Sequence, residues 1–201
     1  MNSDVFWSGA FALIGVIIGS ALSWGIEWQR ERRATGRSRL LVAALCSAEL
    51  RIFAERCEDV AYDDGTYMGQ MAGRYENGEE YLEPQVSEPD LPTWPADMRW
   101  DAIDSKDVQI IFRLPIERRR MLGALGDTRL NDFPPFGDTF AERQSGYARM
   151  ALHVLNIARR LETSAGLTPP DEIVIRGRLE TISHRFPQCS AGRELGHNDR
   201  P

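Results

Sequence analysis

The pattern of hydrophobic and polar positions separates an apolar N-terminal stretch from a longer region with helical periodicity. The 22 residues between Asp4 and Glu27 are all uncharged. As a helix they would reach about 33 Å, which matches a hydrocarbon core of about 30 Å. Trp24 and Trp28 lie near the C-terminal end, where indole rings favour the headgroup layer. A core helix of a soluble protein would normally have a polar face, whereas this stretch has no charged residue. The stretch therefore predicts a transmembrane helix over 5–28.

A cluster of arginines follows this stretch and orients it. The N-terminal segment 1–4 contains no Lys or Arg, which argues against a cleaved signal peptide. The positive-inside rule places segment 1–4 outside and the rest of the chain in the cytoplasm. This layout is typical of single-pass proteins of the bacterial inner (plasma) membrane, with the lipid bilayer as a partner. The same side chains could also bind anionic lipid headgroups. The cluster consists of Arg30, Arg32, Arg33, Arg37 and Arg39.

Small side chains share one face of the predicted transmembrane helix. They recur at steps of three and four residues, and two of the glycines form a GxxxG pair that lets two helix backbones approach closely. This face favours self-association, so a homo-oligomer formed through the helix is one predicted assembly. The face consists of Ser8, Ala12, Gly15, Gly19 and Ser23.

Helical periodicity continues through segment 29–63. A soft point is expected at Thr35-Gly36, and the helix is expected to end at Asp63, Asp64 and Gly65. Apolar residues recur there at steps of three and four, which predicts a buried face. The predicted face contains Leu41, Ala44, Ala48 and Ile52, widened by Leu40 and Leu45.

Segment 64–104 lacks helical periodicity and is rich in Gly, Pro and aromatic residues. We expect an irregular region in which a short helix over 68–75 is one option. From Glu55 to Asp104 there are 14 acidic and 3 basic residues, a net charge of −11, whereas the whole chain carries −6. Such an acidic surface argues against a nucleic acid partner. The segment is either a solvated loop or a functional site that folds back onto the helices.

Helical periodicity returns over 105–186, and a disordered tail is expected over 187–201. Ser105 is a plausible N-cap for a helix to about Arg113, and Pro115 restarts a second helix that stops at Gly126. A third helix is predicted between a capping box of Thr139 with Glu142 and a C-terminal Gly166, and a fourth begins after Thr168. The buried seam of the third helix is predicted to contain Tyr147, Ala151, Val154, Ala158 and Leu161, and that of the fourth Ile175, Leu179, Ile182 and Phe186.

No motif in the sequence indicates a catalytic, cofactor-binding or metal site. Nucleotide-binding glycine patterns, HExxH, GxSxG and CxxC are absent, and the three cysteines have no metal-ligand spacing. His153 is expected beside a helix interface, His184 near a helix C-terminus and His197 in the tail. Each is more typical of a structural or exposed histidine than of a catalytic one. We therefore predict no catalytic residues, no cofactor and no metal.

The sequence predicts an all-α fold, with the transmembrane helix continuing into a cytoplasmic bundle of about four or five helices. The leading hypothesis is a non-enzymatic protein-interaction or scaffolding module, with an unknown protein partner and no nucleic acid. The alternative is an enzyme or sensor for a membrane-proximal ligand that uses the acidic aromatic segment 63–104. A cleft of converging carboxylates in that segment would favour the alternative.

Overall fold

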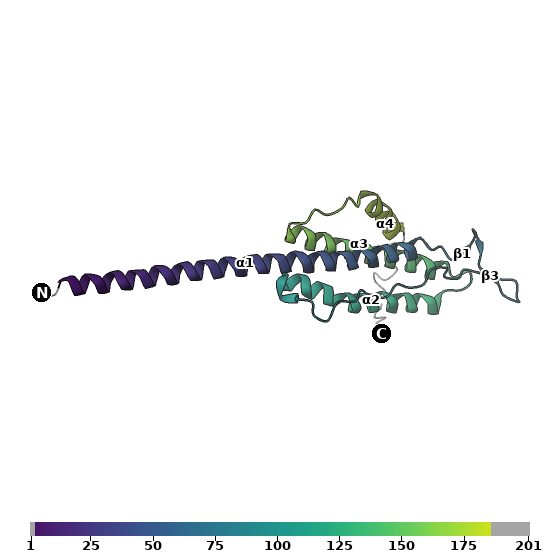
Figure 1. The fold of residues 1–201 in the computed structure, drawn as a ribbon. Coiled ribbons are helices and arrows are strands. Elements are labelled where there is room, and N and C mark those ends of the chain that lie inside the picture. Colours follow the sequence, from purple (N-terminus) through teal and green to yellow (C-terminus); the bar gives the residue numbers. More distant parts are fainter. Residues whose placement is uncertain (1–2, 186–201) are drawn as a thin grey trace, which may run out of the picture.

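The computed structural model describes the backbone of residues 3–185, and the side chains of residues 24, 27–30 and 34–185. It is mostly helical. Helix α1 (Ser3–Tyr62) projects well beyond the bundle, and its C-terminal part lies along α2 (Ser105–Asn131) and α3 (Gly137–Ala165), as Figure 1 shows. Helix α4 (Ile173–Arg185) packs across α3. The mainly helical character expected from the sequence is confirmed.

The transmembrane part of the predicted fold class requires correction. Across the part of the chain that the structure describes, no helix is both long and apolar enough to cross a membrane. Helix α1 continues past the predicted boundary at residue 28 without a break at Thr35-Gly36. Of the projecting part, the side chains of residues 3–23 are not among those described, and the remainder carries recurrent charges at Glu27, Arg30, Arg37 and Arg39. Such charges are costly to place in hydrocarbon, so the described part of the projecting helix contains no apolar span.

The buried face of α1 is a heptad seam that lies opposite the predicted one. Its residues recur at steps of three and four, the repeat of helices that pack along their length. The seam packs mainly against α3. The predicted face is exposed at Leu41, Leu45 and Ile52, so that prediction is wrong. Both faces have apolar residues at helical spacing, and periodicity alone cannot say which one a neighbour covers. The buried seam consists of Ala43, Cys46, Leu50, Phe53, Cys57 and Val60.

The predicted seam of α3 is confirmed. All five of its residues are buried, and all five lie with the α1 seam in a single hydrophobic core. Full burial of each large apolar side chain contributes about 1.5–3 kcal/mol, so this interface is the main apolar contribution to the fold. At its C-terminus Gly166 has φ +77°, and the N–H groups of Gly166 and Leu167 donate to Thr163 and Glu162. This is a Schellman motif, as expected from the glycine.

The two helices predicted over 105–125 are one continuous helix, α2. Pro115 lies inside it, and the helix passes Gly126 to end at Asn131. An internal proline costs about 3 kcal/mol or more in a helix. Burial of Ile111 and Leu114 on the side facing the bundle offsets that cost. The N-cap is Asp104, which accepts a hydrogen bond from the N–H of Lys106 at 2.8 Å.

The ends of α3 and α4 also differ from expectation. Thr139 lies inside α3, and its N–H donates to the Asp132 carboxylate at 2.7 Å, so an aspartate before the helix provides the cap. Helix α4 begins at Ile173 rather than after Thr168. Its predicted stripe is buried at Leu179 and Ile182. Phe186 and the tail lie outside the described residues.

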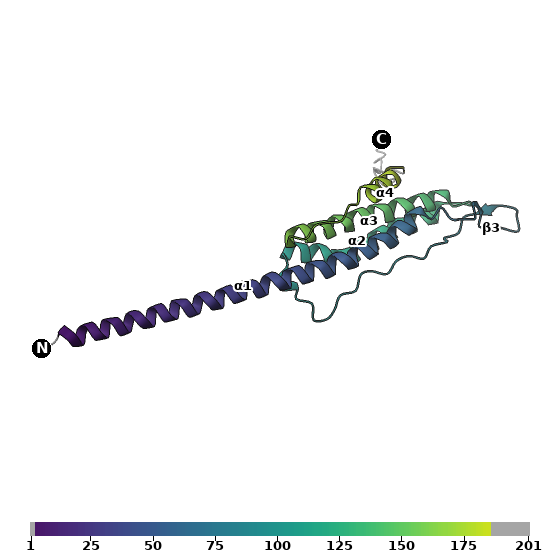
Figure 2. The same cartoon turned by 45° about the horizontal axis from the view of Figure 1, so that its top comes forward.

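Segment 64–104 contains two small antiparallel hairpins that the sequence did not predict. Strand β1 (Thr66–Tyr67) pairs with β2 (Gln70–Met71), and β3 (Gly73–Arg74) pairs with β4 (Glu80–Tyr81). The ring of Tyr81 packs directly over Gly73, so any larger residue there would displace the tyrosine. The hairpins lie at the end of the bundle opposite the projecting part of α1. From them the chain returns along the bundle to a short 3-10 helix, η1 (Trp100–Ala102), and α2 (Figure 2).

Candidate functional site

A buried ion pair fastens segment 64–104 to the helices. The Asp63 carboxylate accepts hydrogen bonds from the Arg143 guanidinium at 2.7 Å and from the N–H groups of Gly65, Gln85 and Val86 at 2.9–3.0 Å. Only 2% of the Asp63 side chain and 5% of the Arg143 side chain is exposed. Burial acts to raise the pKa of Asp63, but these hydrogen bonds and the arginine charge outweigh it, and the pKa lies below its usual value.

Arg143 also joins this anchor to the chain that follows the hairpins. Its second terminal nitrogen donates to the Val86 carbonyl at 2.5 Å, and the Gln144 side chain donates to the Asp63 carbonyl. The Asp63 carboxylate and the terminal nitrogens of Arg143 therefore all have hydrogen-bond partners. The arrangement holds the segment in place and leaves no free carboxylate for acid–base chemistry.

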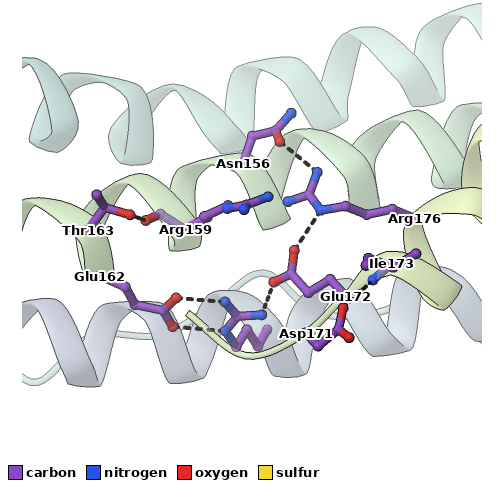
Figure 3. Close-up of polar contacts among 9 residues, drawn as sticks. Asn156, Arg159, Glu162, Thr163, Asp171, Glu172, Ile173 and Arg176 are labelled. Carbon is purple, nitrogen blue, oxygen red and sulfur yellow. Dashed lines mark hydrogen bonds and ion pairs between the residues drawn. The ribbon is translucent and has the colours of Figure 1, made fainter. Parts of the chain in front are cut away.

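A second polar cluster joins α1, α3 and α4. Arg51 donates to both carboxylate oxygens of Glu162, at 2.7 and 2.9 Å, and also pairs with Glu172. Arg176 donates to Glu172 at 2.6 Å and to Asn156 at 2.7 Å (Figure 3). The hydrogen bond to Glu162 contributes most to a raised pKa of Arg51. Two arginines and two glutamates neutralise one another, so this cluster is a clamp that holds α4 and its linker.

Cysteines and histidines do not form a reactive centre in the described part of the chain. Cys46 and Cys57 are buried in the core, and burial raises the pKa of their thiols to about 11 and about 12. They are therefore protonated at neutral pH and poor nucleophiles. His153 lies 3.1 Å from Glu117 of α2, and His184 lies in the last turn of α4. Among the described residues no group of three or more potential ligands could hold a metal ion.

An apolar stripe runs along the solvent side of α1, opposite its buried seam. Leu41, Leu45 and Ile52 are 59%, 44% and 42% exposed. Ala48, between them, is exposed as well. We call Leu41, Leu45, Ala48 and Ile52 the outer stripe. Its edges carry exposed charges of both signs, which have no ion-pair partner within the described residues: Arg37, Glu49, Glu55 and Arg56.

A pocket of about 540 Å³ lies at the hairpin end of the bundle. One wall comes from the chain between Tyr75 and Glu88, and the other from the C-terminal part of α2 and the first turns of α3. A cleft with converging carboxylates in this segment would favour the alternative hypothesis of an enzyme or sensor. The pocket has two, Glu83 and Glu88, together with two arginines.

The residues predicted as sites do not come together. The side chains of Ser8, Ala12, Gly15, Gly19 and Ser23 lie outside those described, as do those of Arg32 and Arg33. Arg30, Arg37 and Arg39 are exposed on α1, and their contact with lipid headgroups stays a prediction. The ion-pair clusters and the pocket were missed because their members lie far apart in the sequence. Of their members only Asp63 has a local sequence signal, which is that of a helix stop.

Comparisons with protein-family models, curated proteins and solved structures give no match to this chain.

Proposed function

We propose that the protein is a non-enzymatic interaction module that binds an amphipathic helix of a partner along the outer stripe of α1. One observation carries the proposal: α1 has two apolar faces, and the bundle covers only one of them. Contiguous apolar side chains on a helix surface commonly mark a site of protein association. The outer stripe has steps of four, three and four, the spacing that a second helix can follow.

The charges at the edges of the stripe suit the same partner. Arg37 and Glu55 border one edge, and Glu49 and Arg56 border the other. In paired helices such flanking positions form interhelical ion pairs that set partner choice and orientation. A partner helix with an apolar seam and charged flanks would complement this surface. The interior acidic groups at Asp63, Glu162 and Glu172 are engaged with arginines, and this also favours a structural role over catalysis.

Site-specific photo-crosslinking in the native host tests the proposal, with adjacent leucines as matched positions. Leu40 and Leu41 are both about half exposed, at 47% and 59%. They point about 100° apart around the helix, because a turn contains 3.6 residues. p-Benzoylphenylalanine at position 41 is expected to give a discrete adduct, and the same group at position 40 is expected to give little.

A second substitution makes the test independent of the crosslinker. Leu45→Glu is expected to remove the adduct formed from position 41. It should change the thermal midpoint of the full chain by only a few degrees, because the side chain is half exposed. Equal adducts from positions 40 and 41, or an adduct that survives Leu45→Glu, would show that the outer stripe does not bind a partner. Mass spectrometry of the adduct distinguishes a second copy from another protein.

A further inference from the structure

The pocket at the hairpin end has the walls of a small-molecule site. Leu122 and Leu125 of α2 and Phe140 of α3 form apolar surface on one side, and Tyr75 and Tyr81 of the hairpin face them from the other segment. A volume of about 540 Å³ falls inside the range of about 300–1,000 Å³ that is typical of ligand pockets. These walls would accept one large aliphatic or aromatic group.

The charges of the pocket separate into neutralised and available groups. Arg143 is paired with Asp63 at 2.7 Å, and Glu88 is paired with Arg118 at 3.3 Å. Arg129 and Glu83 also line the pocket, and neither has an ion-pair partner among the residues the structure describes. Arg129 belongs to α2 and Glu83 to the opposite wall. The pocket therefore offers one available positive and one available negative side chain beside an apolar surface.

We infer that this pocket binds a free α-amino acid with a large apolar side chain. The carboxylate of the ligand pairs with Arg129, since a guanidinium presents two parallel donors to a carboxylate. The ammonium of the ligand pairs with Glu83, and the side chain packs against Leu122, Leu125 and the tyrosines. Both side chains are exposed to solvent, and an anion alone or a cation alone would use only one of the two available charges. The zwitterion satisfies both groups.

The test uses the full-length chain and three probes that share one side chain: L-tryptophan, N-acetyl-L-tryptophan and L-tryptophanamide. Ligand-observed saturation-transfer NMR measures the affinity of each. L-Tryptophan is expected to bind most tightly, because each of the other two lacks one charge. Arg129→Gln should weaken L-tryptophan and N-acetyl-L-tryptophan about fivefold and leave L-tryptophanamide unchanged. Glu83→Gln should weaken L-tryptophan and L-tryptophanamide by a similar factor and leave N-acetyl-L-tryptophan unchanged, as expected for partly exposed charge pairs.

A pair of glycines in α2 supplies a blocking variant and its control. Gly126 lines the pocket and Gly123 does not. A Cβ added at either position meets no atom within 4 Å, and leucine is a better helix former than glycine. Gly126→Leu should therefore fill the pocket and abolish binding of all three probes while the fold is kept, as circular dichroism would show. Gly123→Leu should bind as the parent chain does.

The inference is overturned if the parent chain binds none of the probes at millimolar concentration. It is equally overturned if binding survives Gly126→Leu, because the ligand would then sit elsewhere. A loss of affinity in Arg129→Gln that is the same for all three probes would show a structural effect and not recognition of a carboxylate. None of these results bears on the outer stripe. That stripe lies on the solvent-facing side of α1, and no residue of α1 lines the pocket among the described residues.

Discussion

Two regions of this molecule are held by different forces. The seam between α1 and α3 is apolar along its whole length, and its stability is spread over many side chains. Segment 64–104 contributes only Ile103 to that core, although Trp94, Trp100 and other apolar side chains pack against it partly buried. Its hairpin end is fastened by one buried ion pair between Asp63 and Arg143, with five hydrogen bonds around it. Distributed apolar contacts tolerate the loss of one member, whereas a single polar anchor does not. The difference indicates which substitution should lower the stability of each region most.

The largest effect is expected at the anchor. Asp63→Asn removes the charge that compensates buried Arg143, and breaking such a pair costs about 3–5 kcal/mol. We expect the free energy of unfolding, measured with urea, to fall by about 4 kcal/mol. Hydrogen exchange should become faster over 65–86, where the backbone N–H groups contact Asp63, before it changes in α1 and α3. Asp64→Asn is the matched control, since Asp64 is exposed and, among the described residues, its side chain accepts hydrogen bonds only from Thr66. A similar loss of stability in both variants would contradict the role of Asp63 as an anchor.

A somewhat smaller effect is expected in the seam. Leu50 is fully buried, and Leu50→Ala leaves a cavity that costs about 3 kcal/mol. Leu45→Ala, on the outer stripe, should cost less than about 1 kcal/mol in the same measurement, because the side chain is about half exposed. Hydrogen exchange in Leu50→Ala should accelerate in α1 and α3 together, unlike the local response of the anchor. Comparable losses in the two leucine variants would mean that the outer stripe is covered by a partner in solution.

The smallest effect is expected from mild acid. The pKa of Asp63 is lowered in the folded state, so its contribution to stability is complete above the unfolded value of about 3.9 and is lost as the pH falls through the folded value. Between pH 6 and pH 4 we expect little change from this group, followed by a decline at lower pH. The decline should be shallower in Asp63→Asn. Urea denaturation as a function of pH checks this, and identical profiles for both chains would contradict the assignment.

The two regions also differ in how far the sequence predicted them. The α3 seam followed directly from its spacing. The apolar residues beside it, Ala148, Met150, Leu155 and Ile157, are buried as well, so α3 has no exposed apolar face comparable to that of α1. Helix α1 has two apolar faces at the same spacing, and periodicity does not distinguish the buried face from the exposed one. The continuity of α2 through Pro115 was missed, since local chemistry favours a break and only burial of Ile111 and Leu114 offsets it.

The candidate sites were less predictable than the helices. Asp63 and Arg143 lie 80 residues apart, and Arg51 and Glu162 lie 111 residues apart. Charged residues of these types occur throughout the chain, and no local pattern marks the few that become buried. The pocket likewise combines Glu83 with Arg129, which line the same cavity only when the hairpins fold against the end of α2. The glycines that permit the hairpins carry a local signal, because Gly65, Gly69 and Gly78 have positive φ angles.

By itself the sequence determined that this chain is mainly helical, where α3 packs, that α3 ends at Gly166, and that an irregular acidic segment separates α1 from α2. These features depend on periodicity and on capping residues, which act over a few positions. The tertiary structure decided which face of α1 is buried, that Pro115 is tolerated, and which charges are paired. Each of those outcomes depends on what lies across the interface, since burial is a property of two surfaces and a single segment supplies only one of them.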